Sequence, residues 1–279
     1  MVIRVIKSKD NRIFKDTLSL LRKKERDGRG LYLIEGEKLV AEAVKEGLVK
    51  TVITNSDRVC SRDFSQTFPI LSEFKDDRIE VVFMVGKLFE RLTQTETSQG
   101  IIAVVKKYFK KKEEGSYASF LRRVSDSKKP ILVLDKLQDP GNIGTLIRTA
   151  EATGFAGVIS VKGTGDFYSP KAVRAAAGST MRVPLLESEN YRALLDIIKK
   201  TGRILVSTSP EAKEMYFETE DDVNTAIVIG NEGGGVSDFL LSASVYCVKL
   251  PMAGRVESLN AAVCGAVIMY HSYMKRNLV

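Results

Sequence analysis

The sequence has one histidine and three cysteines among its 279 residues. A single histidine excludes zinc sites built on several histidines and argues against a Ser-His-Asp triad. We expect that histidine, His271, to be partly packed or exposed, because it follows a long apolar stretch. Cys60, Cys247 and Cys264 are far apart and lack metal-ligand spacing. The sequence therefore predicts no metal site, and it favours the reducing cytoplasm.

Long hydrophobic runs are also absent. No apolar stretch approaches the roughly 20 residues that span a bilayer, and residues 1–7 carry too short an apolar run for a signal peptide. We expect no membrane association. The chain is long enough for two domains, and its 44% hydrophobic content permits a well-buried core.

Positive charge is concentrated near the amino terminus. The net charge is +8, and residues 1–30 hold ten Lys or Arg against four acidic residues. A second basic cluster, residues 106–112, surrounds Tyr108 and Phe109. Both clusters fit a face that attracts phosphates, and both fit solvated surface charge.

The first part of the chain, residues 1–105, has the pattern of a small α/β unit. Residues 13–26 resemble one basic amphipathic helix that ends near Gly28 and Gly30. Residues 106–129 are strongly charged and predict a linker with a short helix. The other expected elements of the unit are a helix at 37–46, a short helix at 85–92, and strands at 1–7, 31–34, 49–54, 79–84 and 101–105.

Residues 130–279 alternate regularly between strands and helices. The apolar run 131–134 is typical of a parallel strand buried on both faces. The whole pattern predicts an α/β fold, a mostly parallel sheet with helices on both faces. The expected strands are 131–134, 158–161, 183–186, 204–207, 226–229 and 245–248, and the expected helices are 143–153, 170–177, 191–200 and 259–275.

Three turns in this second part join a strand to a helix and carry polar residues that a turn does not need. They are Asp139-Pro-Gly-Asn-Ile-Gly, Gly230-Asn-Glu-Gly-Gly-Gly235 and the segment 250–260. Ligands of open α/β sheets bind at the carboxyl ends of strands, where these turns lie. The sequence therefore predicts that the three turns meet in one cleft.

Two common nucleotide sites are disfavoured. The Gly230 turn has P-loop spacing, but Val236 stands where the lysine is needed. The turn after strand 131–134 lacks the G-x-G-x-x-G pattern of dinucleotide folds. Three successive glycines beside a buried strand favour a tight, ligand-facing turn over a flexible one. Asn142 suits a helix N-cap, and Arg148, set among apolar residues, suits an anionic partner.

Together the motifs resemble the SpoU/TrmH family of RNA ribose 2′-O-methyltransferases, in the SPOUT class. Asn142-x-Gly-x-x-x-Arg148, Gly230-Asn-Glu232-Gly and Leu250-Pro-Met-x-Gly-x-x-x-Ser258-Leu-Asn260 carry the resemblance. The segments 33–38 and 99–104 are more loosely similar to the family's substrate-binding domain. The resemblance implies a C-terminal trefoil knot, S-adenosylmethionine as cofactor, and a homodimer that packs through the first and closing helices of the second domain.

The resemblance also implies roles for particular residues. The active-site set is Asn142, Arg148, Glu232, Ser258 and Asn260. Backbone near Gly230, Leu250 and Leu259 contacts the cofactor. An RNA methyltransferase must bind a polyanion, for which the candidates are Lys7, Lys15, Arg22, Lys23, Lys24 and Arg26.

The substrate is less closely defined by the sequence. The extra amino-terminal domain favours ribosomal RNA. Transfer RNA, methylation of a base, and a non-catalytic RNA-binding or assembly role remain alternatives.

Overall fold

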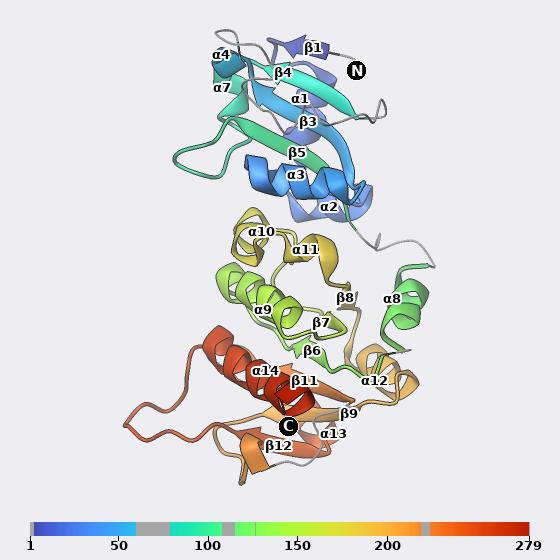
Figure 1. The fold of residues 1–279 in the computed structure, drawn as a ribbon, viewed down its shortest axis with the longest axis vertical. Helices are drawn as coiled ribbons and strands as arrows, with labels where there is room; N and C mark the ends of the chain where they lie inside the picture. Colours follow the sequence, from blue (N-terminus) through green and yellow to red (C-terminus); the bar gives the residue numbers. More distant parts are fainter. Residues whose placement is uncertain (1–2, 60–78, 108–114, 126, 219–223, 279) are drawn as a thin grey trace.

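The structure is a computed structural model that describes residues 3–59, 79–107, 115–125, 127–218 and 224–278. Its described residues form two β-sheets, which lie one above the other along the long axis of the molecule (Figure 1). Cys60 and the aromatic pair of the second basic cluster, Tyr108 and Phe109, lie outside the described residues.

The amino-terminal sheet has five strands in the order β1-β4-β3-β5-β2. Strand β5 runs antiparallel to β2 and β3, whereas β4 pairs in parallel with β1 and β3. The strands are β1 (Ile3–Ile6), β2 (Leu31–Glu35), β3 (Val49–Asn55), β4 (Glu80–Met84) and β5 (Ile101–Lys106), and the helices are α1 (Arg12–Ser19), α2 (Lys23–Arg29), α3 (Glu37–Lys45), α4 (Ser56–Val59) and α7 (Gly86–Phe89).

The single helix expected over residues 13–26 is wrong, because the chain forms two helices there, α1 and α2. Leu20 ends α1, and its carbonyl accepts a hydrogen bond of 2.7 Å from Nη1 of Arg26. Helix α2 ends at Gly30, whose φ of 64° is the left-handed conformation that glycine tolerates. The break thus coincides with a local hydrogen bond between residues six apart, while the glycine stop follows from the sequence.

The carboxyl-terminal sheet has seven parallel strands in the order β10-β12-β9-β11-β6-β7-β8. Every carboxyl end consequently lies at the same edge of this sheet. The strands are β6 (Ile131–Leu134), β7 (Gly157–Val161), β8 (Leu185–Ser188), β9 (Ile204–Thr208), β10 (Glu214–Met215), β11 (Thr225–Ile229) and β12 (Tyr246–Lys249).

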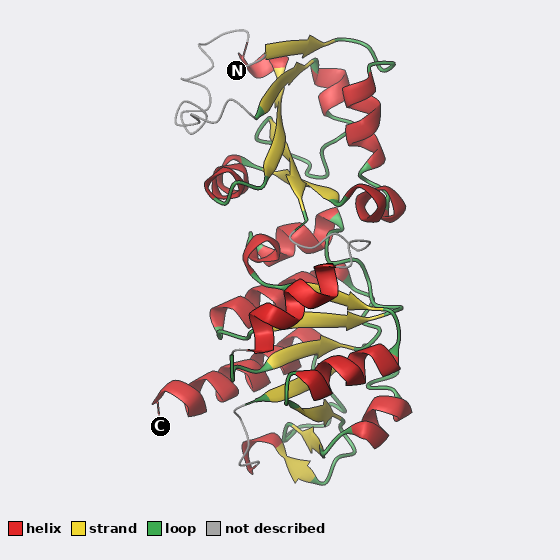
Figure 2. Cartoon of the chain, turned by 90° about the vertical axis from the view of Figure 1, so that its right-hand side faces the viewer, coloured by secondary structure: helices red, strands yellow, loops and turns green. Residues whose placement is uncertain are grey.

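Helices cover both faces of this sheet (Figure 2). In β6, Leu132 and Leu134 pack into the core on one face, and Ile131 and Val133 into the core on the other. The expected α/β fold with a smaller α/β domain before it is confirmed. On the first face lie α9 (Pro140–Ala152), α10 (Pro170–Ala176), α11 (Ser179–Arg182) and α14 (Ala261–Leu278), and on the second α8 (Gly115–Ser125), α12 (Tyr191–Lys200) and α13 (Asp238–Ala243). Among the described residues no helix is long and apolar enough to cross a membrane.

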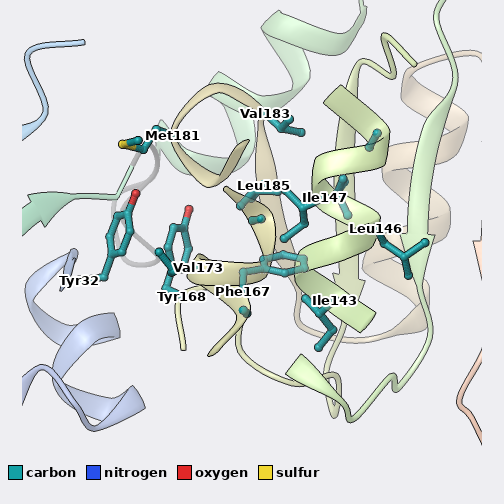
Figure 3. Packing of buried hydrophobic residues seen from close by; sticks show 14 of the residues in the cluster. Tyr32, Ile143, Leu146, Ile147, Phe167, Tyr168, Val173, Met181, Val183 and Leu185 are labelled. Carbon is teal, nitrogen blue, oxygen red and sulfur yellow. The ribbon is translucent and has the colours of Figure 1, made fainter. Parts of the chain in front are cut away.

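Helix α9 packs unusually close to two other helices. A Cβ atom on Gly144 would lie 2.3 Å from the carbonyl oxygen of Ala172 in α10, and one on Gly265 of α14 would lie 2.4 Å from Leu146. The absence of a side chain at Gly265 is thus what allows α14 to approach α9 so closely. Ile143 and Ile147 of α9 point toward Phe167 and Leu185, whereas Leu146 points to the other side of the helix (Figure 3).

The two domains meet through a buried polar and aromatic junction. Both Nε and Nη2 of Arg26 donate to Oδ2 of Asp166, at 3.0 and 2.5 Å. Lys107, which donates to Asp27 of α2 at 2.7 Å, places its Nζ 4.4 Å from the ring centroid of Tyr168 in the second domain. The rings of Tyr32 and Tyr168 lie 4.8 Å apart, centroid to centroid, and face each other across the junction (Figure 3). One continuous apolar core therefore runs from the amino-terminal sheet into the second domain.

Candidate active site

The three motifs converge at the carboxyl edge of the second sheet. The 139–144 turn follows β6 and opens α9, the 230–235 loop follows β11, and the 250–260 segment follows β12 and leads into α14. Strand β11 pairs with β6, so the first two turns lie side by side.

Glu232 holds the first two motifs together. Its Oε1 accepts hydrogen bonds from the backbone N–H of Asp139 at 3.2 Å and from Nδ2 of Asn142 at 3.0 Å. Its Oε2 accepts from the backbone N–H of Gln138 at 3.2 Å. One carboxylate thus joins two segments that are 90 or more residues apart in the chain.

Asn260 extends this connection to the third motif. Its Nδ2 donates to Oδ1 of Asn142 at 3.1 Å, across 118 residues of sequence, while its own Oδ1 accepts from the backbone N–H of Ala262 at 2.9 Å. We call the series Glu232–Asn142–Asn260 the amide relay. Asn142 uses both ends of its side-chain amide in it, so its orientation is fixed.

The expectation that Asn142 is the N-cap of α9 is wrong. Asp139 is the cap: its Oδ1 accepts from the backbone N–H of Asn142 at 2.9 Å, and Pro140 occupies the first helical position. Lys171 pairs with the other oxygen of Asp139 at 3.0 Å. Sequence reasoning missed both residues, although Asp139-Pro140 has the same cap-then-proline pattern as Ser169-Pro170, where Ser169 caps α10.

The carboxylates of the edge are held in their ionised forms. Burial raises the pKa of Glu232, but the hydrogen bond from Asn142 and the backbone N–H donors outweigh it, so the net pKa lies below the ordinary value. Backbone donation from Asn142 and the contact with Lys171 lower the pKa of Asp139. The amide relay therefore begins on a negative charge at neutral pH.

The glycine loop is tightly closed. A Cβ atom on Gly230 would lie 2.2 Å from backbone atoms of Gly235 and Val236, so only glycine fits. Asn231 and Gly235 exchange two backbone hydrogen bonds of 2.9 Å, and Oδ1 of Asn231 accepts from Gly233 and Gly234. The tight turn expected from the three glycines is present in this form.

The 250–260 segment has the opposite character. It projects from the body of the domain between β12 and α14 (Figure 1), and residues 253–260 are exposed. Within the described part of the chain, residues 250–259 make no backbone–backbone hydrogen bond with one another or with other segments. Their N–H and C=O groups are thus available to a ligand, which fits a cofactor that is recognised through backbone.

Arg148 and Ser258 are placed less firmly than the amide relay. Arg148 lies on the exposed side of α9, and its side chain makes no hydrogen bond or ion pair with the described residues. Its anionic partner is thus not another described residue. Ser258 is exposed within the 250–260 segment. Of the expected cofactor contacts, Gly230 is buried, Leu250 is half-buried and Leu259 is 37% exposed.

The structure divides the six expected RNA-binding residues. Lys7, Lys15, Arg22 and Lys24 are exposed. Arg26 is a wrong choice, because it is 4% exposed and paired with Asp166 inside the domain junction. Lys23 is half-buried and contacts Glu187 at 3.2 Å, so it too serves the junction.

The second basic cluster, the possible metal ligands and His271 form no further site among the described residues. Lys107 of the second basic cluster is buried against Asp27, and Lys110–Lys112 lie outside the described residues. In the described ranges no group of three or more His, Cys, Asp or Glu residues could hold a metal ion. His271 is half-buried, with its ring 4.8 Å from that of Phe217.

The chain belongs to the SpoU rRNA Methylase family, whose model matches residues 129–270. The model of the MRM3-like substrate binding domain matches residues 11–103. These matches confirm the resemblance that the three motifs carry.

Similar proteins cover the chain almost from end to end. It is 33% identical over 267 residues to the 23S rRNA (guanosine(2553)-2′-O)-methyltransferase RlmP of Bacillus subtilis, covering 95% of this chain and 98% of that protein. An AdoMet-bound rRNA methyltransferase from Sinorhizobium meliloti has a TM-score of 0.83 and 25% identity, covering 99% of both chains. The SpoU methyltransferase AviRb from Streptomyces viridochromogenes, in complex with AdoMet, has a TM-score of 0.82 and 27% identity, covering 95% of this chain and 98% of that one.

Proposed function

We propose that the protein is an S-adenosylmethionine-dependent methyltransferase that modifies a ribose 2′-hydroxyl in ribosomal RNA. The observation that carries this proposal is the amide relay, which brings one residue from each of the three motifs into direct contact. Membership of the SpoU family and the rRNA methyltransferases among the similar proteins support the reaction and the substrate class.

The residues of the edge divide the work of positioning. S-adenosylmethionine supplies an electrophilic methyl group, so the chain must align a sugar oxygen with it and stabilise the charge that develops there. Arg148 is exposed and has no protein partner among the described residues, which leaves its planar fork for an RNA phosphate and the developing alkoxide. Asn142, Ser258 and Asn260 position the sugar, and Glu232 orients Asn142.

The backbone next to these residues would bind the cofactor. The free backbone groups of residues 250–259, together with Gly230, form a frame that contacts its adenosine part without charged side chains. Leu250 and Leu259 supply apolar contacts beside that backbone. We assign residues 1–105 to RNA binding, 106–129 to a linker and 130–279 to catalysis.

A C-terminal trefoil knot is part of this proposal. Strand β12 lies two strands away from β11, yet the chain returns from it to the start of α9, where Asn260 donates to Asn142, and α14 packs against α9. Pulling the chain by its two ends in an optical trap tests the knot. A tightened knot shortens the fully unfolded chain, so an extension equal to the contour length of an unknotted chain would exclude the knot.

We also propose a homodimer through α9 and α14. Four large apolar side chains follow one exposed stripe of α14 at helical spacing: Val263, Val267, Tyr270 and Met274, which are 39–53% exposed. Val267→Asp is expected to yield monomers in analytical ultracentrifugation, whereas the exposed Val5→Asp in the first domain leaves the mass unchanged. A monomeric unmodified protein would contradict the dimer.

The reaction is tested directly with the purified chain, deproteinised ribosomal RNA and tritium-labelled S-adenosylmethionine. We expect label in RNA, at a nucleotide that resists cleavage on its 3′ side because its 2′-oxygen is methylated. Arg148→Lys should lower kcat/KM by about 100-fold, since lysine cannot reproduce the bidentate fork. Near-normal turnover of Arg148→Lys would remove the need for the fork.

The alternatives give different results in the same assay. Label in transfer RNA instead of ribosomal RNA would show that transfer RNA is the substrate. If a base were methylated, the 2′-hydroxyl would stay free and the RNA would still be cleaved on the 3′ side of that nucleotide. If S-adenosylmethionine fails to bind in calorimetry, the chain is a non-catalytic RNA-binding protein.

A further inference from the structure

A stacked aromatic pair with one exposed ring lies close to the glycine loop. Tyr191 begins α12 and Phe239 is the second residue of α13, and their rings stack at 5.1 Å with an interplanar angle of 21°. Phe239 is 44% exposed, whereas Tyr191 is partly buried and packs against the core on the second face of the sheet. A stacked aromatic ring that faces solvent offers a surface for another ring.

The pair is held rigidly by one buried carboxylate. Asp135, at the carboxyl end of β6, is 1% exposed. Its Oδ1 accepts from the hydroxyl of Tyr191 at 3.0 Å, and its Oδ2 accepts from the backbone N–H of Ser237 at 2.8 Å. Because Ser237 caps α13, the first turns of both helices are tied to the same group, which fixes the two rings relative to each other.

Lys136 adds a positive charge to the pair. Its Nζ lies 5.6 Å from the centroid of Tyr191, and its side chain is exposed. Its φ is 58°, an uncommon value for a residue with a side chain. Three bonds hold this backbone: its N–H donates to Thr164 at 3.0 Å, and its carbonyl accepts from Asn231 and Gln138, each at 2.8 Å.

The same bonds connect Lys136 to the amide relay. Asn231 precedes Glu232 in the chain, and the backbone N–H of Gln138 donates to Glu232. The aromatic pair therefore lies one loop away from the residues that we assign to the target ribose.

We propose that Phe239, stacked on Tyr191 beside Lys136, is a platform on which a base of the RNA strand next to the target nucleotide stacks. This inference rests on the proposed function and extends it to a residue that determines how the substrate binds. Every base has an aromatic face, so the platform fixes the position of the strand without reading its sequence. The negative charge of Asp238, next to Phe239, repels phosphate. We therefore expect the phosphate of the stacked nucleotide to contact Lys136, which lies beside the ring of Tyr191.

The test compares Phe239→Ala, Phe239→Tyr and the unmodified protein as full-length chains with deproteinised ribosomal RNA. We expect Phe239→Ala to raise KM for RNA about tenfold, because one base loses its stacking partner. We expect kcat at saturating RNA and the affinity for S-adenosylmethionine to be unchanged, and Phe239→Tyr to restore KM. Val245→Ala is the control, since Val245 is 59% exposed at the amino end of β12.

Lys136→Gln gives a second, independent measurement. Loss of one phosphate contact should reduce the slope of log affinity for a single-stranded RNA against log salt by about 0.7. An RNA KM that is equal in Phe239→Ala and the unmodified protein overturns the platform. If Phe239→Ala does not fold, Lys136→Gln decides, and a salt slope equal to that of the unmodified protein overturns the platform. If the unmodified protein transfers no methyl group to RNA, the proposed function fails instead.

Discussion

Asn142 is in the relay because another residue caps its helix. Asp139 satisfies the free N–H groups at the start of α9, so the Asn142 side chain is available to Glu232 and Asn260. The motif residues could be found from the sequence, and the Asp139 cap was predictable from Asp-Pro. Which residue bonds to which was not, because the partners are 90 and 118 residues away.

Asn142→Ala tests the relay. Removal of the amide leaves Glu232 and Asn260 without their common partner, so kcat should fall by about 100-fold, in the range of a lost active-site donor. Rapid-quench methyl transfer at saturating substrates measures it, and calorimetry with S-adenosylmethionine serves as the control, with affinity expected to be unchanged. A normal kcat would show that the relay only shapes the fold.

The loss of stability caused by Glu232→Gln should depend on pH. The pKa of Glu232 is lower in the folded protein than its ordinary value, so its charged form stabilises the fold above that ordinary value. This contribution is lost as the pH falls through the folded pKa. Urea unfolding should therefore show the variant less stable by a constant amount from about pH 8 to about pH 5, with the gap closing below about pH 4. A gap that widens in acid would contradict the assignment.

Between elements, the close crossings of α9 determine how the second domain packs. The alternation of strands and helices follows from apolar runs, and most expected elements are present. The short α11 and α13 and the two-residue strand β10 were not expected, because they are too short for a periodic pattern. The break between α1 and α2 escaped prediction for another reason: the amphipathic pattern continues across it.

Gly144→Ala should destabilise the protein. The new methyl group would meet the carbonyl of Ala172 at 2.3 Å and the Cβ of Ala175 at 2.6 Å, which forces α9 and α10 apart. Such overpacking costs about 1–3 kcal/mol of unfolding free energy. Gly28→Ala in α2 is the matched control: nothing lies within 4 Å of its Cβ, and alanine favours helix, so stability should rise slightly. Equal urea midpoints for the two variants would contradict the packing argument.

For the whole molecule, the domain junction sets where bound RNA lies relative to the catalytic edge. Besides the pairs of Arg26 and Lys107, Arg182 contacts Glu42 of α3 at 2.8 Å and also pairs with Glu151 of α9. The sequence could not reveal this junction, since charged residues are expected at the surface and Arg26 is 140 residues from Asp166. The division of the chain at 106–129 remains a prediction.

Asp166→Asn should loosen this junction. It leaves the buried Arg26 guanidinium without its counter-charge, which costs about 3 kcal/mol or more. Calorimetry should show a lower Tm and a separate transition for the first domain, and small-angle scattering should show a larger radius of gyration. Asp10→Asn removes the exposed pair with Lys15 and should cost less than about 1 kcal/mol. A single transition at an unchanged Tm in Asp166→Asn would show that the Arg26–Asp166 pair does not hold the two domains together.

The bond from Asn260 to Asn142 has a consequence for biosynthesis. Translation adds Asn142 to the chain 118 residues before Asn260, so for that stretch of synthesis the nascent chain lacks the third member of the amide relay. A chain that has not yet reached Asn260 therefore has at most two members of the amide relay, Glu232 and Asn142.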